Sequence, residues 1–139
     1  ESVLLALAEQ QGIRSDVIPQ IATGFCGGLS HTGGLCGAVS GAVMGIGLAF
    51  GRKAPEDNRE RLSAAVPAFL CAFEAQFGDL TCPGLTGCDL GTPAGQAKFH
   101  TEGRAALCHR LVAEAARLAA ELIAPPASPA PSQETYATR

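Results

Sequence analysis

Residues 34–51 read GLCGAVSGAVMGIGLAFG, a stretch of small and apolar residues with no charged side chain. Its apolar character predicts a helix over residues 35–50. Four glycines recur at every fourth position and so fall on one face of this helix: Gly33, Gly37, Gly41 and Gly45. A face without Cβ atoms lets a second helix backbone come close. We therefore expect this helix at the centre of an all-α protein.

A membrane span is the alternative interpretation of this helix. Lys, Arg, Asp and Glu are absent from residues 17–51, and small residues four apart are common where membrane helices pair. Against a span, seven glycines between positions 33 and 51 lower both hydrophobicity and helix propensity. We expect a helix buried inside the protein, with the glycine face used either within the bundle or as the interface of a homodimer.

Apolar residues at helical spacing predict four more helices, over residues 2–11, 17–22, 63–77 and 102–123. The expected inward side chains of the first three are Val3, Leu4, Leu7 and Ala8; Val17, Ile18, Ile21 and Ala22; and Val66, Leu70, Phe73 and Phe77. The fold class is thus a compact all-α bundle of about five helices. It forms a single domain over residues 1–124, followed by a flexible, disordered Pro/Ala/Ser-rich tail at 125–139.

Two segments interrupt the helical pattern. Residues 24–34 hold five glycines and predict a shaped loop. Residues 82–93 are rich in Pro, Gly and Thr and predict turns, in which Asp89 closes a turn through its own side chain.

Composition excludes several classes of function. The 139 residues include 10 basic and 13 acidic ones, a formal charge of −3, so no nucleic-acid-binding surface is expected. The sequence contains no Gly-rich nucleotide loop after a strand and no Ser/His/Asp order typical of hydrolases. We therefore do not interpret it as an enzyme. No targeting segment is recognisable, and a cytoplasmic location is expected.

Six cysteines need an explanation. A chain of this length folds on its own core, so disulfides are not needed for stability. The spacing contains no C-x-x-C pair, which argues against a zinc site. Cys71 lies at helical spacing among apolar residues and is predicted to be a buried, inert thiol.

Five of the six cysteines lie in four ordered blocks: GFCGG at 24–28, GLCGAVSGA at 34–42, CPGLTGCDL at 82–90 and CHRLV at 108–112. In this order the sequence resembles the C_GCAxxG_C_C family of redox-active proteins, from Val3 to about Leu122. A similar domain is part of split-Soret cytochrome c, where it is associated with a 2Fe–2S cluster. The C-x-x-C-H motif of haem attachment is absent here, so the haem part of that relative does not carry over.

The resemblance implies a 2Fe–2S cluster held by thiolates, for electron transfer or redox sensing with a redox partner protein. Cys36, Cys82 and Cys108 match three cysteines of the family pattern. The first family cysteine usually precedes the position where this sequence begins, so the fourth ligand is open. Cys88 is the expected fourth ligand, with Cys26 as the alternative. Thiolates that converge from separate elements are what such a cluster requires.

Two other functions remain open from the sequence. Cys82 with Cys88, or Cys26 with Cys36, could cycle as thiol–disulfide pairs without metal. The chain could also be a structural subunit of a larger redox complex. The three histidines carry no site prediction: His31 and His109 are expected to face solvent, and His100 lies in a predicted connection.

Overall fold

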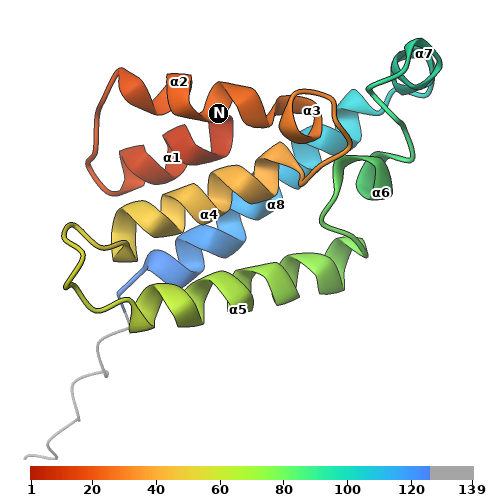
Figure 1. Cartoon of the computed structure of the whole chain (residues 1–139). Helices are drawn as coiled ribbons and strands as arrows, with labels where there is room; N and C mark the ends of the chain where they lie inside the picture. Colours follow the sequence, from red (N-terminus) through yellow and green to blue (C-terminus); the bar gives the residue numbers. More distant parts are fainter. Residues whose placement is uncertain (126–139) are drawn as a thin grey trace, which may run out of the picture.

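The computed structural model describes residues 1–125 and shows an all-α protein without a strand in that range (Figure 1). The helices that pack into the bundle are α1 (Ser2–Gln10), α4 (Gly37–Phe50), α5 (Glu60–Phe77) and α8 (Ala105–Ile123). The remaining elements are α2 (Val17–Ala22), a 3-10 turn (Thr23–Phe25), α3 (Cys26–Leu29), α6 (Cys82–Thr86) and α7 (Pro93–Thr101). The all-α prediction is confirmed. The number of helices is slightly higher than the five expected, because α3, α6 and α7 lie where only loops were predicted.

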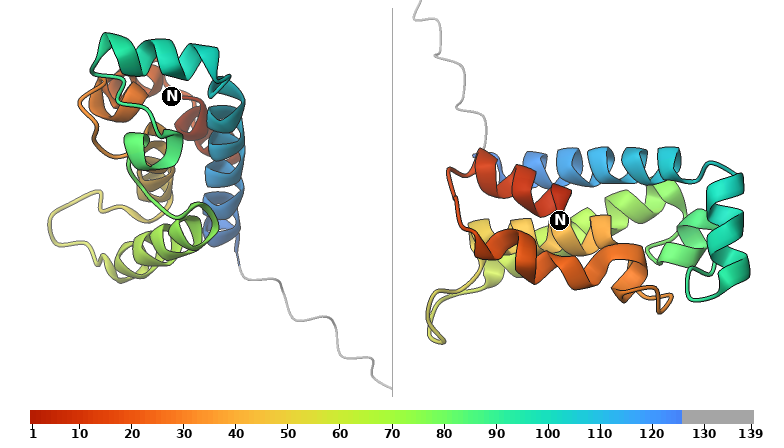
Figure 2. Two further views of the ribbon diagram at one scale, coloured as in Figure 1. Left: turned by 90° about the vertical axis from the view of Figure 1, so that its right-hand side faces the viewer. Right: turned by 90° about the horizontal axis from the view of Figure 1, so that it is seen from above.

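The glycine-rich helix α4 is central, as predicted, and packs on α1, α5 and α8 (Figures 1 and 2). Its glycine face receives α1: a Cβ on Gly41 would lie 3.2 Å from the Cβ of Val3, and one on Gly45 would lie 2.8 Å from the Cβ of Leu7. The same chain also covers Gly37, where a Cβ would lie 2.7 Å from the Phe25 carbonyl oxygen. The predicted place of Gly33 on this face is wrong, because Gly33 precedes α4 and lies in left-handed backbone (φ 76°). A homodimer, which stays a prediction, would need another surface.

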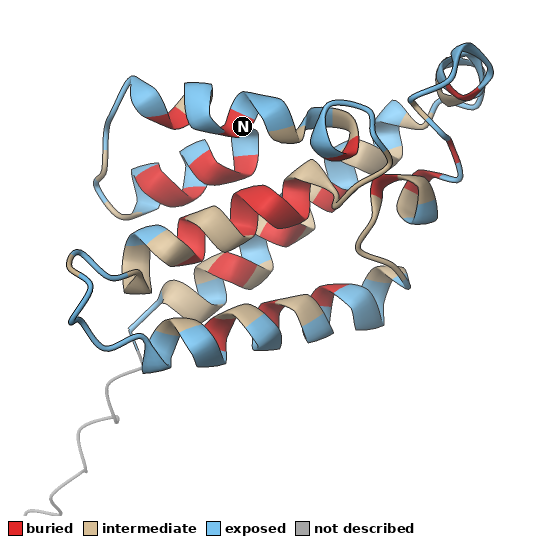
Figure 3. Ribbon diagram, viewed as in Figure 1, coloured by how far each residue is buried: buried red, intermediate tan, exposed pale blue. Residues whose placement is uncertain are grey.

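The core between α4, α5 and α8 is built on aromatic and small side chains (Figure 3). On α5 the fully buried residues are Phe69 and Phe73, whose rings lie 5.9 Å apart. The predicted inward stripe of α5 included Phe73 but not Phe69, and so was rotated slightly from the real one. On α1, all four predicted inward residues are buried.

The prediction for α2 was half wrong. Ile18 and Ala22 are buried, but Val17 and Ile21 are 54% and 51% exposed. This short helix lies on the outside of α1 (Figure 2) and can bury only one narrow side, whose residues are four positions apart.

The short elements α3, α6 and α7 gather at one end of the bundle (Figures 1 and 2). α7 is largely exposed, with Gly95 its one buried residue (Figure 3). Its start could have been read from Thr92 and Pro93, a capping residue followed by a proline at the first helical position. Within residues 1–125 no helix is long and apolar enough to cross a membrane. The predicted tail beyond Pro125 lies outside the described residues.

Candidate thiol site

Four cysteines from four separate elements line one cavity of about 690 Å³ at this end of the bundle. Cys26 begins α3, Cys36 directly precedes α4, Cys82 begins α6, and Cys108 lies in the first turns of α8. The three cysteines expected from the family resemblance thus line one cavity, and Cys26 lines it as well.

A short antiparallel bridge fixes Cys36 relative to Cys82. Leu35 and Thr81 form the bridge, in which the Cys36 N–H donates to the Leu80 carbonyl (2.8 Å) and the Cys82 N–H donates to the Gly34 carbonyl (3.0 Å). Since side chains alternate along extended backbone, both cysteines lie on the face opposite to the bridged pair. Two sequence-distant thiols are thereby placed on one side of the same bridge.

The segment that leads into Cys82 is held by a carboxylate. Asp79 Oδ1 accepts hydrogen bonds from the Leu80 N–H (2.7 Å), the Thr81 N–H (2.6 Å) and the Thr81 hydroxyl (2.8 Å). The Thr81 hydroxyl in turn accepts from the Gly84 N–H (3.2 Å) and so caps α6. The bonds from Thr81 and Leu80 hold the pKa of Asp79 below its usual range. Sequence reasoning missed this support, although Asp-x-Thr ahead of Cys-Pro is a capping pattern.

Backbone between Cys26 and Cys36 makes a left-handed turn. Residues 27–31 all have positive φ, including the non-glycine residues Leu29 (56°), Ser30 (53°) and His31 (68°). Such a conformation costs about 1–2 kcal/mol for each non-glycine residue, and strained backbone of this kind is concentrated at functional sites. Gly28, buried in the turn, packs directly on Cys82: a Cβ there would lie 2.6 Å from the Cys82 Cβ.

Some features of the cavity disfavour the thiolate form of its cysteines, and others favour it. Burial, and then the charge of neighbouring thiolates such as Cys36, raise the pKa of Cys82 above its usual range and that of Cys108 to about 11. The amino ends of α4 and α8 favour negative charge nearby, because their first N–H groups lack helical partners. Without a cation to balance them, Cys82 and Cys108 are therefore mainly protonated at neutral pH.

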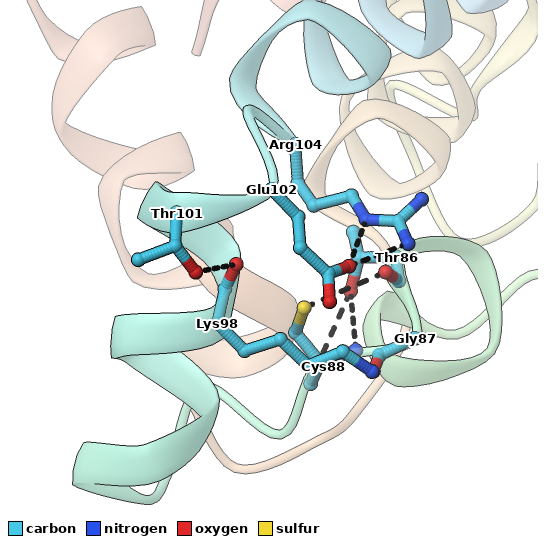
Figure 4. A network of polar contacts seen from close by, with 7 residues as sticks. All are labelled: Thr86, Gly87, Cys88, Lys98, Thr101, Glu102 and Arg104. Atoms are coloured by element: carbon cyan, nitrogen blue, oxygen red, sulfur yellow. Dashed lines mark hydrogen bonds and ion pairs between the residues drawn. The ribbon is translucent and has the colours of Figure 1, made fainter.

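Cys88 and Cys71 do not line this cavity, although, besides burial, the charge of Cys88 contributes to the raised pKa of Cys82 and of Cys108. Cys88 is 1% exposed, and its thiol donates to the Thr86 carbonyl (3.5 Å; Figure 4). The Thr86 hydroxyl donates to the Cys82 carbonyl (2.8 Å) and accepts from the Cys88 N–H (3.2 Å), so it ties the two cysteines together through backbone. Cys71 is exposed, which makes the prediction of a buried thiol wrong. Its position on α5, two residues from both Phe69 and Phe73, turns it away from the core.

All three histidines line the cavity, from three different elements. His31 follows α3, His100 lies on α7, and His109 lies on α8 next to Cys108. Each is exposed, as expected for His31 and His109. Their gathering at one cavity was not predicted, because the sequence offers no spacing signal across these elements. The predicted turn at Asp89 is present: its Oδ1 accepts from the Gly91 N–H (3.0 Å).

Among the described residues, no three His, Cys, Asp or Glu side chains form a group that could hold a single metal ion. A binuclear cluster has a different requirement, since each of its irons takes only two protein ligands.

Comparison with protein families agrees with the cysteine arrangement. Residues 1–122 match the family described as "Putative redox-active protein (C_GCAxxG_C_C)". The chain belongs to this family. The searches of curated proteins and of solved structures found no match. The family is described as redox-active, and this is the function class that the comparison supports.

Proposed function

We propose that this protein holds a 2Fe–2S cluster through the thiolates of Cys26, Cys36, Cys82 and Cys108, and exchanges single electrons with a redox partner protein. The observation that carries the proposal is that these four thiols, far apart in sequence, line one cavity. Four thiolates are the usual ligand set of such a cluster. Compared with the set expected from the sequence, Cys26 replaces Cys88, because Cys88 is buried outside the cavity.

Three features of the chain fit this group. The bridge between Leu35 and Thr81 fixes the backbone of Cys36 relative to that of Cys82, and both cysteines line the cavity. Gly37, Ala38 and Gly28 line the cavity, so little side-chain bulk competes for space near the sulfur atoms. The raised pKa values of Cys82 and Cys108 mean that iron must displace protons from these thiols, and the positive metal then removes the repulsion among the thiolates. When bound, the cluster supplies a one-electron carrier.

Anaerobic reconstitution of the full chain with ferrous iron and sulfide tests the proposal. We expect two irons and two sulfides per chain, visible absorption that bleaches on reduction, and an electron paramagnetic resonance signal from the reduced form. Cys36→Ser, Cys82→Ser and Cys108→Ser should each abolish or alter this spectrum. Cys71→Ser is the matched control, since Cys71 is exposed and outside the cavity, and it should leave the spectrum unchanged. A protein that stays colourless after reconstitution would refute the proposal.

The fourth ligand is tested by a separate pair of variants. Cys26→Ser should shift the spectrum and lower the iron content, whereas Cys88→Ser should keep the spectrum and only lower stability, because that thiol packs in the interior. An unchanged spectrum in Cys26→Ser would show that the fourth ligand lies outside this set, as a cysteine preceding Glu1 would.

A metal-free thiol–disulfide function is the second candidate, and one contact favours it. The Cα of Cys26 lies 3.7 Å from where a Cβ on Gly37 would stand, which brings Cys26 close to the neighbouring Cys36. In this reaction a disulfide such as oxidised glutathione takes up two electrons and two protons while the Cys26 and Cys36 thiols form an S–S bond. Differential alkylation with mass spectrometry would find a reversible loss of two hydrogens on this pair, and no bound iron.

A further inference from the structure

The cavity has a wall that carries no cysteine. α7 lies at the end of the molecule, beyond α6 and the first turn of α8 (Figures 1 and 2). It contributes Gln96, Phe99 and His100 to the lining, and Leu90 joins them from the preceding loop. The four thiols come from α3, α4, α6 and α8 instead. A ligand held by the thiols therefore does not account for the side chains that α7 presents to the same space.

The cavity is also larger than a cluster needs. Its volume of about 690 Å³ lies in the range of roughly 300–1,000 Å³ typical of small-molecule sites. If each atom takes about the 30 Å³ share of a water molecule, two irons and two sulfides occupy roughly 120 Å³. More than half of the space then remains beside the cluster, an estimate that rests on the proposed function.

The chemistry of the lining narrows the class of ligand. Leu90, Phe99 and Val112 offer apolar contacts, while the Gln96 amide and the imidazoles offer N–H donors. In the described part of the chain no Lys or Arg side chain lines the cavity, and Glu1 is its one carboxylate. Phosphate groups are mostly bound by cationic side chains or at helix amino ends. The α7 wall presents neither, since the α7 residues that line it follow the first three residues of the helix, so nucleotides and flavin nucleotides do not fit this wall. An uncharged, flat molecule with hydrogen-bond acceptors does.

We propose that the α7 side of the cavity binds a small quinone beside the thiol site. The flat ring packs on Phe99, and its carbonyl oxygens accept hydrogen bonds from the imidazole of His100 and from the second N–H of the Gln96 amide, whose first N–H donates to the Leu90 carbonyl (2.9 Å). Phe99 and His100 already lie edge to face, with ring centroids 5.8 Å apart, so the apolar surface and the donor stand next to each other. Phe99 is half-buried and His100 exposed, so the site is reached from solvent.

Duroquinone is a suitable probe, because its four ring methyl groups block addition of the cysteine thiols. Isothermal titration of the full chain, in the metal-free and iron-loaded forms, should show saturable binding of one molecule per chain. Phe99→Ala and His100→Ala should each weaken binding about tenfold, equivalent to about 1.4 kcal/mol. Ala97→Ser is the matched control: it lies on the exposed side of the same helix, outside the cavity lining, and should bind like the original protein.

Each result separates this inference from the proposed function. Absence of saturable binding in both forms, or equal affinity in all three variants, overturns the quinone site even if the cluster assembles. Binding that depends on Phe99 and His100 in a protein that never takes up iron supports the quinone site and refutes the cluster. Circular dichroism checks that the variants stay folded. If Phe99→Ala unfolds, His100→Ala by itself tests the quinone site, because His100 is exposed.

Discussion

Replacing Gly28 by Ala tests how tightly the left-handed turn is packed on the thiol site. Gly28 has φ +73°, and a Cβ there would lie 2.6 Å from the Cβ of Cys82 and 2.7 Å from the Gly34 carbonyl oxygen. The second neighbour is backbone and belongs to the bridge that carries Cys36 and Cys82, so it cannot simply rotate away. The substitution therefore forces either the turn or the bridge to shift.

Two energies add in this variant. A residue with a Cβ in left-handed backbone costs about 1–2 kcal/mol, and overpacking of a filled interior costs about 1–3 kcal/mol more. Gly12 separates the two effects, because it has φ +70° but nothing within 4 Å of the point where its Cβ would stand. We expect Gly12→Ala to lower the free energy of unfolding by about 1–2 kcal/mol and Gly28→Ala by roughly 3–4 kcal/mol.

Urea unfolding followed by circular dichroism measures both losses, and alkylation of Cys82 relative to the exposed Cys71 reports on the site. In Gly28→Ala the ratio of the Cys82 alkylation rate to the Cys71 alkylation rate should be higher than in the original protein. Gly12→Ala should leave this ratio unchanged. Equal losses of stability in the two variants, with the ratio unaffected in both, would refute the argument that the turn is packed against the site.

Phe69→Ala removes a fully buried ring and should lower the free energy of unfolding by about 3–5 kcal/mol in urea titrations; a loss under about 1 kcal/mol would contradict its place in the core. Because the pKa of Cys108 is raised from 9.0 to about 11, the folded protein holds this proton more tightly than the unfolded chain. The stability that the Cys108 proton contributes is present below pH 9 and is lost as the pH rises toward 11. At about pH 8 Cys108 should be alkylated more slowly than Cys71. Equal alkylation rates would argue against the burial of Cys108. Asp79→Asn weakens the acceptor of three hydrogen bonds and should speed alkylation of the site thiols and lower iron uptake. Asp57→Asn, which weakens a similar acceptor of two backbone N–H groups in another loop, should do neither.

Helical periodicity was enough to predict the long helices, and the reason is physical. Helix α1 buries the four residues that its spacing singles out, and Gly78 ends α5 in left-handed backbone as its lack of a Cβ allows. Two errors in predicting buried residues occur in α2, a helix of which only one narrow side packs against the rest of the protein. Val17 and Ile21 of α2 are apolar and periodic, yet no element packs on them, and periodicity cannot tell how much of an apolar stripe finds a partner.

By itself the sequence determined the all-α class and the central place of the glycine-rich helix, because these depend on residue type and local spacing. The choice of Cys36, Cys82 and Cys108 rested on the resemblance to the family. The tertiary structure decided which thiols line the same cavity. Cys88 is six residues from Cys82 and is not among the lining residues, whereas Cys26, which precedes a left-handed turn, is one of them. Sequence separation says nothing about direction once glycines reverse the backbone. The meeting of α3, α4, α6, α7 and α8 at one end therefore had to be seen in three dimensions.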